Sequence, residues 1–215
     1  MIKTKIFRRK ILMYKIGVIG TFGVGKTTFL HRLFSELKYR AFQVEMVPEL
    51  SRLCPYDINE SGQVSRGQYW ICKEQIRLEL EGAELMPDFL LCDRCVFDNT
   101  LFALRGAEEG YVDPAIFSII KDVVEHWQRT YFLLIYIKLE DHLRLCHNRG
   151  MDDGVRSTNE EFQLAIEDLI IKSLDNYSGE KLEISGNLNQ RMDQTLDYLR
   201  LKIDDSRLRD RELPL

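Results

Sequence analysis

Short apolar runs and segments of helical periodicity alternate along the 215-residue chain. The run at 132–137 is continuously apolar, which is typical of a strand buried on both faces of a sheet. Between such runs, apolar residues recur at helical spacing, as at Phe29, Leu33 and Leu37. This alternation predicts an α/β fold of three layers with a parallel sheet between helices.

The same pattern sets the expected elements and the domain limits. Strands are expected at 14–20, 43–47, 88–92, 131–138 and 181–185, and helices at about 26–38, 65–82, 97–105, 114–128, 158–176 and 188–203. Thr158 and Glu161 have the spacing of a capping box at the start of the fifth helix. No repeat or Pro/Gly-rich linker divides the chain, so residues 13–203 are expected to form one domain. Residues 1–12 are expected to be a disordered leader, or an untranslated one that precedes Met13, and 204–215 a charged, mobile tail.

Charge and cysteine content exclude several classes of function. The net charge of −4 disfavours a general duplex-DNA binder, and no apolar run approaches the length of a membrane span. We therefore expect neither a nucleic-acid nor a membrane partner. Five cysteines without a signal sequence indicate reduced thiols in a cytoplasmic protein. Cys92 and Cys95 form a C-x-x-C pair, for which core packing is a better interpretation than a zinc or redox site.

Residues 20–27 match the phosphate-binding pattern G-x-x-x-x-G-K-[ST] between a predicted strand and a predicted helix. Glycines let the backbone curl so that successive N–H groups face one anion, and the helix adds its positive end. Lys26 can reach the β- and γ-phosphates, and the Thr27 hydroxyl can ligate magnesium. The sequence thus predicts a phosphate cradle for ATP or GTP and Mg²⁺, formed by Gly20, Thr21, Phe22, Gly23, Val24, Gly25, Lys26, Thr27 and Thr28.

The rest of the chain separates the classes of P-loop protein. A GTPase should carry an N-K-x-D motif, but the corresponding segment 187–190 lacks the lysine and the aspartate. The third strand ends in Asp93-Arg94, which resembles the D-R or E-R-S of thymidylate kinases and deoxynucleoside kinases. That resemblance implies that Asp93 helps to hold magnesium and that Arg94 neutralises phosphoryl charge. The alternative is that the two residues only cap the strand or pair with each other.

Further motifs strengthen the resemblance to kinases of small molecules. Pro48-Glu49 resembles the E-P segment of deoxynucleoside kinases in reversed order, and Glu49 with Arg52 is similar to the E-x-x-R of ribosylnicotinamide kinase domains and related AAA-type predicted ATPases. Gln75-x-x-x-Glu79 and the segment 152–156 match the same relatives, which are the closest analogues. The resemblance implies that Glu49 accepts the proton of the attacking hydroxyl, and it implies strand order 2-3-1-4-5.

Two further regions are predicted to complete an active site. The segment 144–157 has the position of a kinase lid, where Arg149 and Arg156 are expected to close over the phosphates and Arg144 is more consistent with a solvated position. The acceptor is expected between the second strand and the helix at 65–82, with Arg52, Tyr69, Trp70 and Gln75 as candidate contacts. For the two aromatic residues, core packing is the stronger alternative.

These observations favour ATP- and Mg²⁺-dependent phosphoryl transfer to a small acceptor, a nucleoside or a nucleotide. The catalytic candidates are Lys26, Glu49, Asp93, Arg94, Arg149 and Arg156, with Thr27 and Asp93 at the metal. The alternative is a regulatory NTPase that hydrolyses ATP and acts through a protein partner. A kinase needs an enclosed acceptor pocket, whereas a switch does not. The identity of the acceptor and a homodimeric state are left open by the sequence.

Overall fold

The computed structural model describes residues 13–60, 62–140, 142 and 159–208. The expected leader 1–12, the lid with Arg144, Arg149 and Arg156, and the last residues of the tail lie outside the described residues. Within the described part of the chain, no helix has both the length and the apolar character needed to cross a membrane.

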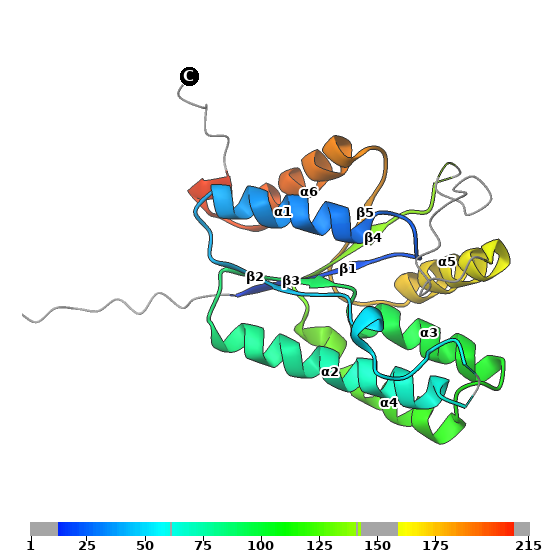
Figure 1. Cartoon of the computed structure of the whole chain (residues 1–215). Helices are drawn as coiled ribbons and strands as arrows, with labels where there is room; N and C mark the ends of the chain where they lie inside the picture. Colours follow the sequence, from blue (N-terminus) through cyan, green and yellow to red (C-terminus); the bar gives the residue numbers. More distant parts are fainter. Residues whose placement is uncertain (1–12, 61, 141, 143–158, 209–215) are drawn as a thin grey trace, which may run out of the picture.

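A five-stranded sheet runs through the centre of the molecule (Figure 1). Its strands are β1 (Tyr14–Ile19), β2 (Val44–Val47), β3 (Phe89–Asp93), β4 (Leu133–Ile137) and β5 (Lys181–Ile184). All neighbouring strands are parallel, and their order is β2-β3-β1-β4-β5. The predicted fold and strand order are therefore confirmed. In the register of the sheet, Val18 of β1 lies opposite Asp93 of β3, so both strands end at the same edge.

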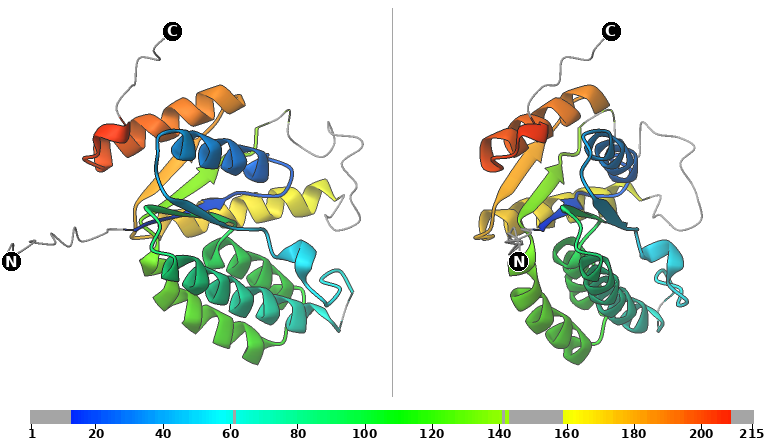
Figure 2. Two further views of the ribbon diagram at one scale, coloured as in Figure 1. Left: turned by 60° about the vertical axis from the view of Figure 1, so that its left-hand side comes forward. Right: turned by 90° about the vertical axis from the view of Figure 1, so that its left-hand side faces the viewer.

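Helices cover both faces of the sheet, as Figures 1 and 2 show. One layer contains α1 (Lys26–Tyr39) and α6 (Leu188–Lys202), which contact each other. The opposite layer contains α2 (Val64–Glu84), α3 (Val96–Glu108), α4 (Pro114–Trp127) and α5 (Glu160–Asp175). Short 3-10 turns lie at η1 (Ser51–Leu53), η2 (Gln128–Thr130) and η4 (Ser206–Leu208).

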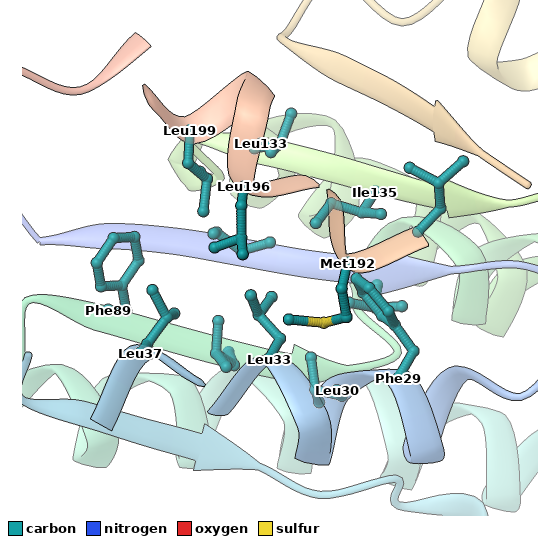
Figure 3. Packing of buried hydrophobic residues seen from close by; sticks show 14 of the residues in the cluster. Phe29, Leu30, Leu33, Leu37, Phe89, Leu133, Ile135, Met192, Leu196 and Leu199 are labelled. Atoms are coloured by element: carbon teal, nitrogen blue, oxygen red, sulfur yellow. The ribbon is translucent and has the colours of Figure 1, made fainter. Parts of the chain in front are cut away.

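Strand residues alternate between two hydrophobic cores. Leu133 and Ile135 face α1 and α6, whereas Leu134 and Tyr136 belong to the cluster on the other face. In Figure 3 the leucines of α1 and the apolar residues of α6 meet over the sheet. Burial on both faces explains why the strands are continuously apolar. Cys92 and Cys95 are buried free thiols in the second cluster, in agreement with the core interpretation.

Two local predictions differ from the structure. The helix α5 is capped by Asn159, whose side chain accepts the hydrogen bond of the Phe162 N–H, so its N-cap is one residue after Thr158. Residues 204–208 of the expected tail are packed against the domain, because the Leu208 side chain is buried in the α1–α6 core and Arg207 pairs with Asp88. Charge alone therefore misled the prediction for 204–208, since one apolar residue anchors the segment.

Glu79 joins α2 to the sheet through a buried polar network. Its carboxylate accepts hydrogen bonds from Lys15 Nζ at 2.8 Å, from Trp127 Nε1 at 2.8 Å and from the Tyr131 hydroxyl. Gln75 Nε2 donates to the same carboxylate at 2.9 Å. Because Lys15 is also buried, this carboxylate is what compensates its charge within the described structure.

Replacing Glu79 by leucine is expected to lower the free energy of unfolding by about 3–5 kcal/mol, because the Lys15 ammonium loses its buried partner. Urea unfolding followed by circular dichroism measures the change. Glu81→Leu on the same helix is the control, since Glu81 is exposed and its ion pair is with the exposed Arg77. Equal stability of the two variants would contradict a structural role for the Glu79 network.

Candidate functional site

The loop between β1 and α1 has a backbone that requires glycine at its ends. Gly20 has φ of +144°, and a Cβ there would lie 2.7 Å from the carbonyl oxygen of Ile137. Gly25 caps α1 in the left-handed region, with φ of +87°. Side chains are strained in both conformations, which explains these two positions of the sequence pattern.

Lys26 lies inside the loop. Its Nζ donates to the carbonyl oxygens of Gly20 at 2.8 Å and Thr21 at 2.7 Å, and the residue is only 6% exposed. Lys26 is therefore buried rather than standing at the edge of an exposed loop, because the loop folds around its ammonium group. Burial lowers the pKa of Lys26 to about 7, and the nearby positive charge of Arg94 acts in the same direction.

Thr27 and Asp93 form an oxygen pair beside the cradle. The Thr27 hydroxyl donates to Asp93 Oδ2 at 2.6 Å. The second carboxylate oxygen, Oδ1, is buried and has no hydrogen-bond partner among the described residues. Mg²⁺ binds hydroxyl and carboxylate oxygens together with waters and phosphates, so this pair fits the ligand chemistry of that ion. Elsewhere in the described residues, no group of three or more His, Cys, Asp or Glu could hold a metal.

Glu49, Arg94 and Asp98 form a charged chain across the carboxyl ends of β2 and β3. Arg94 Nε donates to Glu49 Oε1 at 2.7 Å, and its Nη1 donates to Asp98 Oδ2 at 3.0 Å. Arg94 has φ of +72°, a conformation that L-residues rarely adopt, and its N–H donates to the carbonyl of Val18. The structure therefore places Arg94 at the end of β3, beside β1, and pairs it with two carboxylates rather than with Asp93.

The environment of Glu49 keeps its carboxylate ionised. Burial would raise its pKa, but the charges of Arg94 and Lys26 and the hydrogen bonds from Arg94 and Ser51 outweigh burial and lower the pKa to about 2. Arg52 contributes a longer ion pair, at 3.6 Å, from the exposed side. Glu49 thus faces the cradle and is not diverted from it by Arg52.

A cavity of about 670 Å³, here called the acceptor cavity, opens beside the cradle. Its lining comes from the β2–α2 segment, α2, α3 and the start of α5, and includes Glu49, Arg94, Phe102 and Phe162. A smaller cavity of about 100 Å³ lies in the cradle and is lined by Gly23, Gly25, Lys26, Thr27 and Thr28. Phe22, Glu49 and Arg94 line both cavities, so these three residues form the boundary between them.

The polar contacts expected on α2 are displaced along the helix. Gln75 is 0% exposed and bonds to Glu79 and to the carbonyl of Arg94, outside the lining of the acceptor cavity. Tyr69 and Trp70, on other sides of α2, and Arg52 do not line this cavity either. These four residues were predicted to contact the acceptor, but none of them lines the acceptor cavity.

The cavity instead receives Gln68, seven residues before Gln75, and Asn99 of α3. The face of α2 made by Val64, Gln68 and Ile71 repeats at helical spacing and could have indicated this in the sequence. The sequence pattern does not specify which turn of α2 lies level with the end of the sheet. For Asn99, no comparable spacing in the sequence indicated a position in the cavity lining.

Comparisons with known proteins agree with this geometry. The family model described as AAA domain matches residues 15–191. A deoxyadenosine kinase from M. mycoides, solved with the products dCMP and a flexible dCDP, is similar in structure, with a TM-score of 0.66 and 16% identity over 87% of this chain and 99% of that one. The same enzyme with bound dATP gives a TM-score of 0.65 and 14% identity over the same shares of the two chains. No curated protein matches the chain.

At such low identity the solved structures show the fold alone, whereas the family model covers most of the chain. The chain therefore belongs to the AAA domain family and is a P-loop protein with the fold of nucleoside kinases.

Proposed function

We propose that this protein transfers the γ-phosphoryl group of MgATP to a hydroxyl group of a small, uncharged, nucleoside-like acceptor. The observation that carries the proposal is the boundary formed by Phe22, Glu49 and Arg94 between the cradle and the acceptor cavity. An acceptor in the larger cavity would meet phosphates in the cradle at this boundary. A regulatory NTPase has no need of such a cavity beside its cradle.

The charges around the acceptor cavity favour an uncharged acceptor over a nucleotide. Both arginines of the described lining are already paired, Arg94 with Glu49 and Asp98, and Arg105 with Glu109 at 2.6 Å. Glu161 adds a further carboxylate to the lining. A phosphate group would find little uncompensated positive charge among these residues, whereas a hydroxyl needs none.

Polar and aromatic side chains in the same lining suit a planar heterocycle. Gln68 and Asn99 are each 8% exposed, and neither side chain has a hydrogen-bond partner among the described residues. Each amide can donate and accept at once, which matches the edge of a nucleobase. The rings of Phe22 and Phe162 stack with their centroids 5.9 Å apart, and the ring centroid of Phe102 lies 6.4 Å from that of Phe162, so a group of packed aromatic rings forms part of the lining.

The proposed mechanism relies on positioning and charge. The cradle and Lys26 would hold the β- and γ-phosphates, and Thr27 and Asp93 would hold Mg²⁺, which neutralises phosphate charge when bound. Glu49 would accept a hydrogen bond from the acceptor hydroxyl and orient it toward the γ-phosphate. Arg94, held in position by Glu49 and Asp98, would direct hydrogen-bond donors toward the transferred group.

A panel of acceptors tests this proposal. Nucleosides, nucleoside monophosphates and hydroxyl-bearing vitamins are each incubated with the protein and MgATP, and phosphorylated products are identified by mass spectrometry. The expected result is a phosphorylated product from a nucleoside-like alcohol. A product formed only from monophosphates would contradict the uncharged acceptor, and no product from any acceptor would contradict the kinase.

Binding of MgATP at pH 8.5 is expected to take up close to one proton through Lys26. Its pKa of about 7 leaves the amine mostly neutral at that pH, and polyphosphate restores the ammonium form. The effect should vanish well below pH 7, where the ammonium form already predominates. Calorimetry in buffers of different ionisation enthalpy measures the uptake. Lys26→Arg is the control, since a guanidinium stays protonated, and equal uptake by both proteins would contradict the assignment.

A further inference from the structure

Four carbonyl groups of the phosphate cradle, those of Gly20, Thr21, Phe22 and Val24, accept hydrogen bonds from side chains. Lys26 Nζ holds those of Gly20 and Thr21. Gln163 Nε2 of α5 donates to the carbonyl of Phe22 at 2.8 Å, and Arg191 Nη1 of α6 donates to that of Val24 at 2.7 Å. The two helices lie on opposite faces of the sheet, so the loop is held from both sides (Figures 1 and 2).

Peptide geometry relates these carbonyls to the N–H groups of the cradle. In a trans peptide, the C=O of one residue and the N–H of the next point in opposite directions. With the Phe22 carbonyl directed to Gln163 and the Val24 carbonyl directed to Arg191, the N–H groups of Gly23 and Gly25 point away from these helices. Gly23 and Gly25 both line the small cradle cavity.

We infer that Gln163 and Arg191 are positioning residues, which orient the Gly23 and Gly25 N–H groups toward the phosphates of the donor. The inference rests on the phosphate-binding part of the proposed function and does not depend on the acceptor. Neither side chain lines the cradle cavity or the acceptor cavity, so both act through the backbone of the loop.

Both side chains are themselves fixed. Gln163 is fully buried, and its main-chain carbonyl accepts a hydrogen bond from the Thr21 hydroxyl at 3.2 Å. The loop therefore both donates a hydrogen bond to α5 and accepts one from it. Arg191 is also buried, and its Nη2 lies 3.4 Å from Glu140 Oε1. Glu140 in turn accepts the N–H of Gly186 at 2.6 Å. Arg191 therefore links the cradle to the segments that follow β4 and β5.

The two hydrogen bonds should contribute unequally to anion binding, because Arg191 is a charged donor and Gln163 is not. A hydrogen bond from a charged group contributes more than one between neutral groups. The Arg191 charge also lies close to the cradle, since a Cβ on Gly25 would be 3.6 Å from its Nη1. Arg191 should therefore affect anion binding more strongly than Gln163.

Calorimetric titration with ADP and with inorganic tripolyphosphate, each with Mg²⁺, tests the inference without any turnover. Arg191→Met is expected to raise the Kd for both ligands by about 10- to 100-fold, and Gln163→Met by about 2- to 10-fold. Arg191→Lys keeps the charge but not the planar guanidinium, so its Kd should lie between those of wild type and Arg191→Met. Arg200→Met is the matched control, because Arg200 of α6 also donates to a backbone carbonyl, that of Leu208, away from the cradle.

The measured Kd values distinguish a positioning role from an effect of charge and from poor folding. Unchanged Kd values in Arg191→Met and Gln163→Met, with normal binding by wild type, would overturn the inference while leaving the proposed function intact. Full recovery by Arg191→Lys would assign the Arg191 effect to charge alone and overturn its positioning role. A variant that merely folds poorly would show fewer binding sites at unchanged Kd and a lower Tm, which also counts against the inference. Failure of wild type to bind either ligand would reject the phosphate site itself.

Discussion

Glu49→Gln is expected to lower the rate of phosphoryl transfer by about 10²- to 10⁴-fold, with ATP affinity nearly unchanged. The substitution keeps the shape of the side chain but removes the charge that faces the acceptor and holds Arg94 at 2.7 Å. Steady-state kinetics for both substrates, with ATP binding measured separately, give the comparison. Glu45→Gln on β2, the strand that precedes Glu49, is the control, because Glu45 lines neither cavity.

The low pKa of Glu49 adds a test by pH. A carboxylate with a pKa of about 2 is a weak base, so most of the expected effect comes from orienting the hydroxyl and Arg94 rather than from removing a proton early. Because the folded-state pKa is depressed, Glu49 stays ionised well below pH 4.5, and its contribution is lost only as the pH falls toward 2. An acid limb near pH 4.5 that disappears in Glu49→Gln would contradict this account. A fall confined to the acceptor KM would assign Glu49 to binding alone.

Lys26→Ala is expected to weaken ATP binding by about 100-fold or more, because a cation in contact with the cradle is removed. The fold should survive, since burial of Lys26 is itself unfavourable and the variant relieves that cost, which is full below about pH 7 and disappears as the pH rises toward 10.5. Calorimetry measures the affinity, and thermal unfolding checks the fold.

Lys38→Ala provides the matched control for this change, since Lys38 lies on the same helix but is exposed at its far end. If Lys26→Ala bound ATP as tightly as Lys38→Ala, this result would contradict a role for the cradle in ATP binding. A large drop in Tm in Lys26→Ala alone would instead show that the bonds to Gly20 and Thr21 maintain the loop.

The sequence predicted what depends on local pattern. Strand positions followed from continuous apolar runs, and the cradle followed from glycines with positive φ next to Lys26. Asp93 and Glu49 could be placed because parallel strands end at one edge of the sheet. The absence of a guanine-reading motif at 187–190 also has a local explanation, since Asn187 and Gln190 form the capping box of α6.

Contacts between distant segments could not be predicted in the same way. Gln68 and Gln75 lie seven residues apart along α2, yet one lines the acceptor cavity and the other is buried beneath Arg94. Their roles depend on where the sheet ends along the helix, which periodicity does not specify. Gln163 and Arg191 are more than 100 residues from the loop they hold, and they form no motif with it.

The fate of the γ-phosphoryl group tests the central claim most directly. MgATP labelled in the γ-phosphate is incubated with the protein, with and without the acceptor found in the panel, and the label is followed by mass spectrometry. The label is expected on the acceptor hydroxyl in a 1:1 ratio with ADP, and little inorganic phosphate should form without acceptor. Release of the label as inorganic phosphate at the same rate with and without acceptor would contradict this claim and identify an NTPase instead.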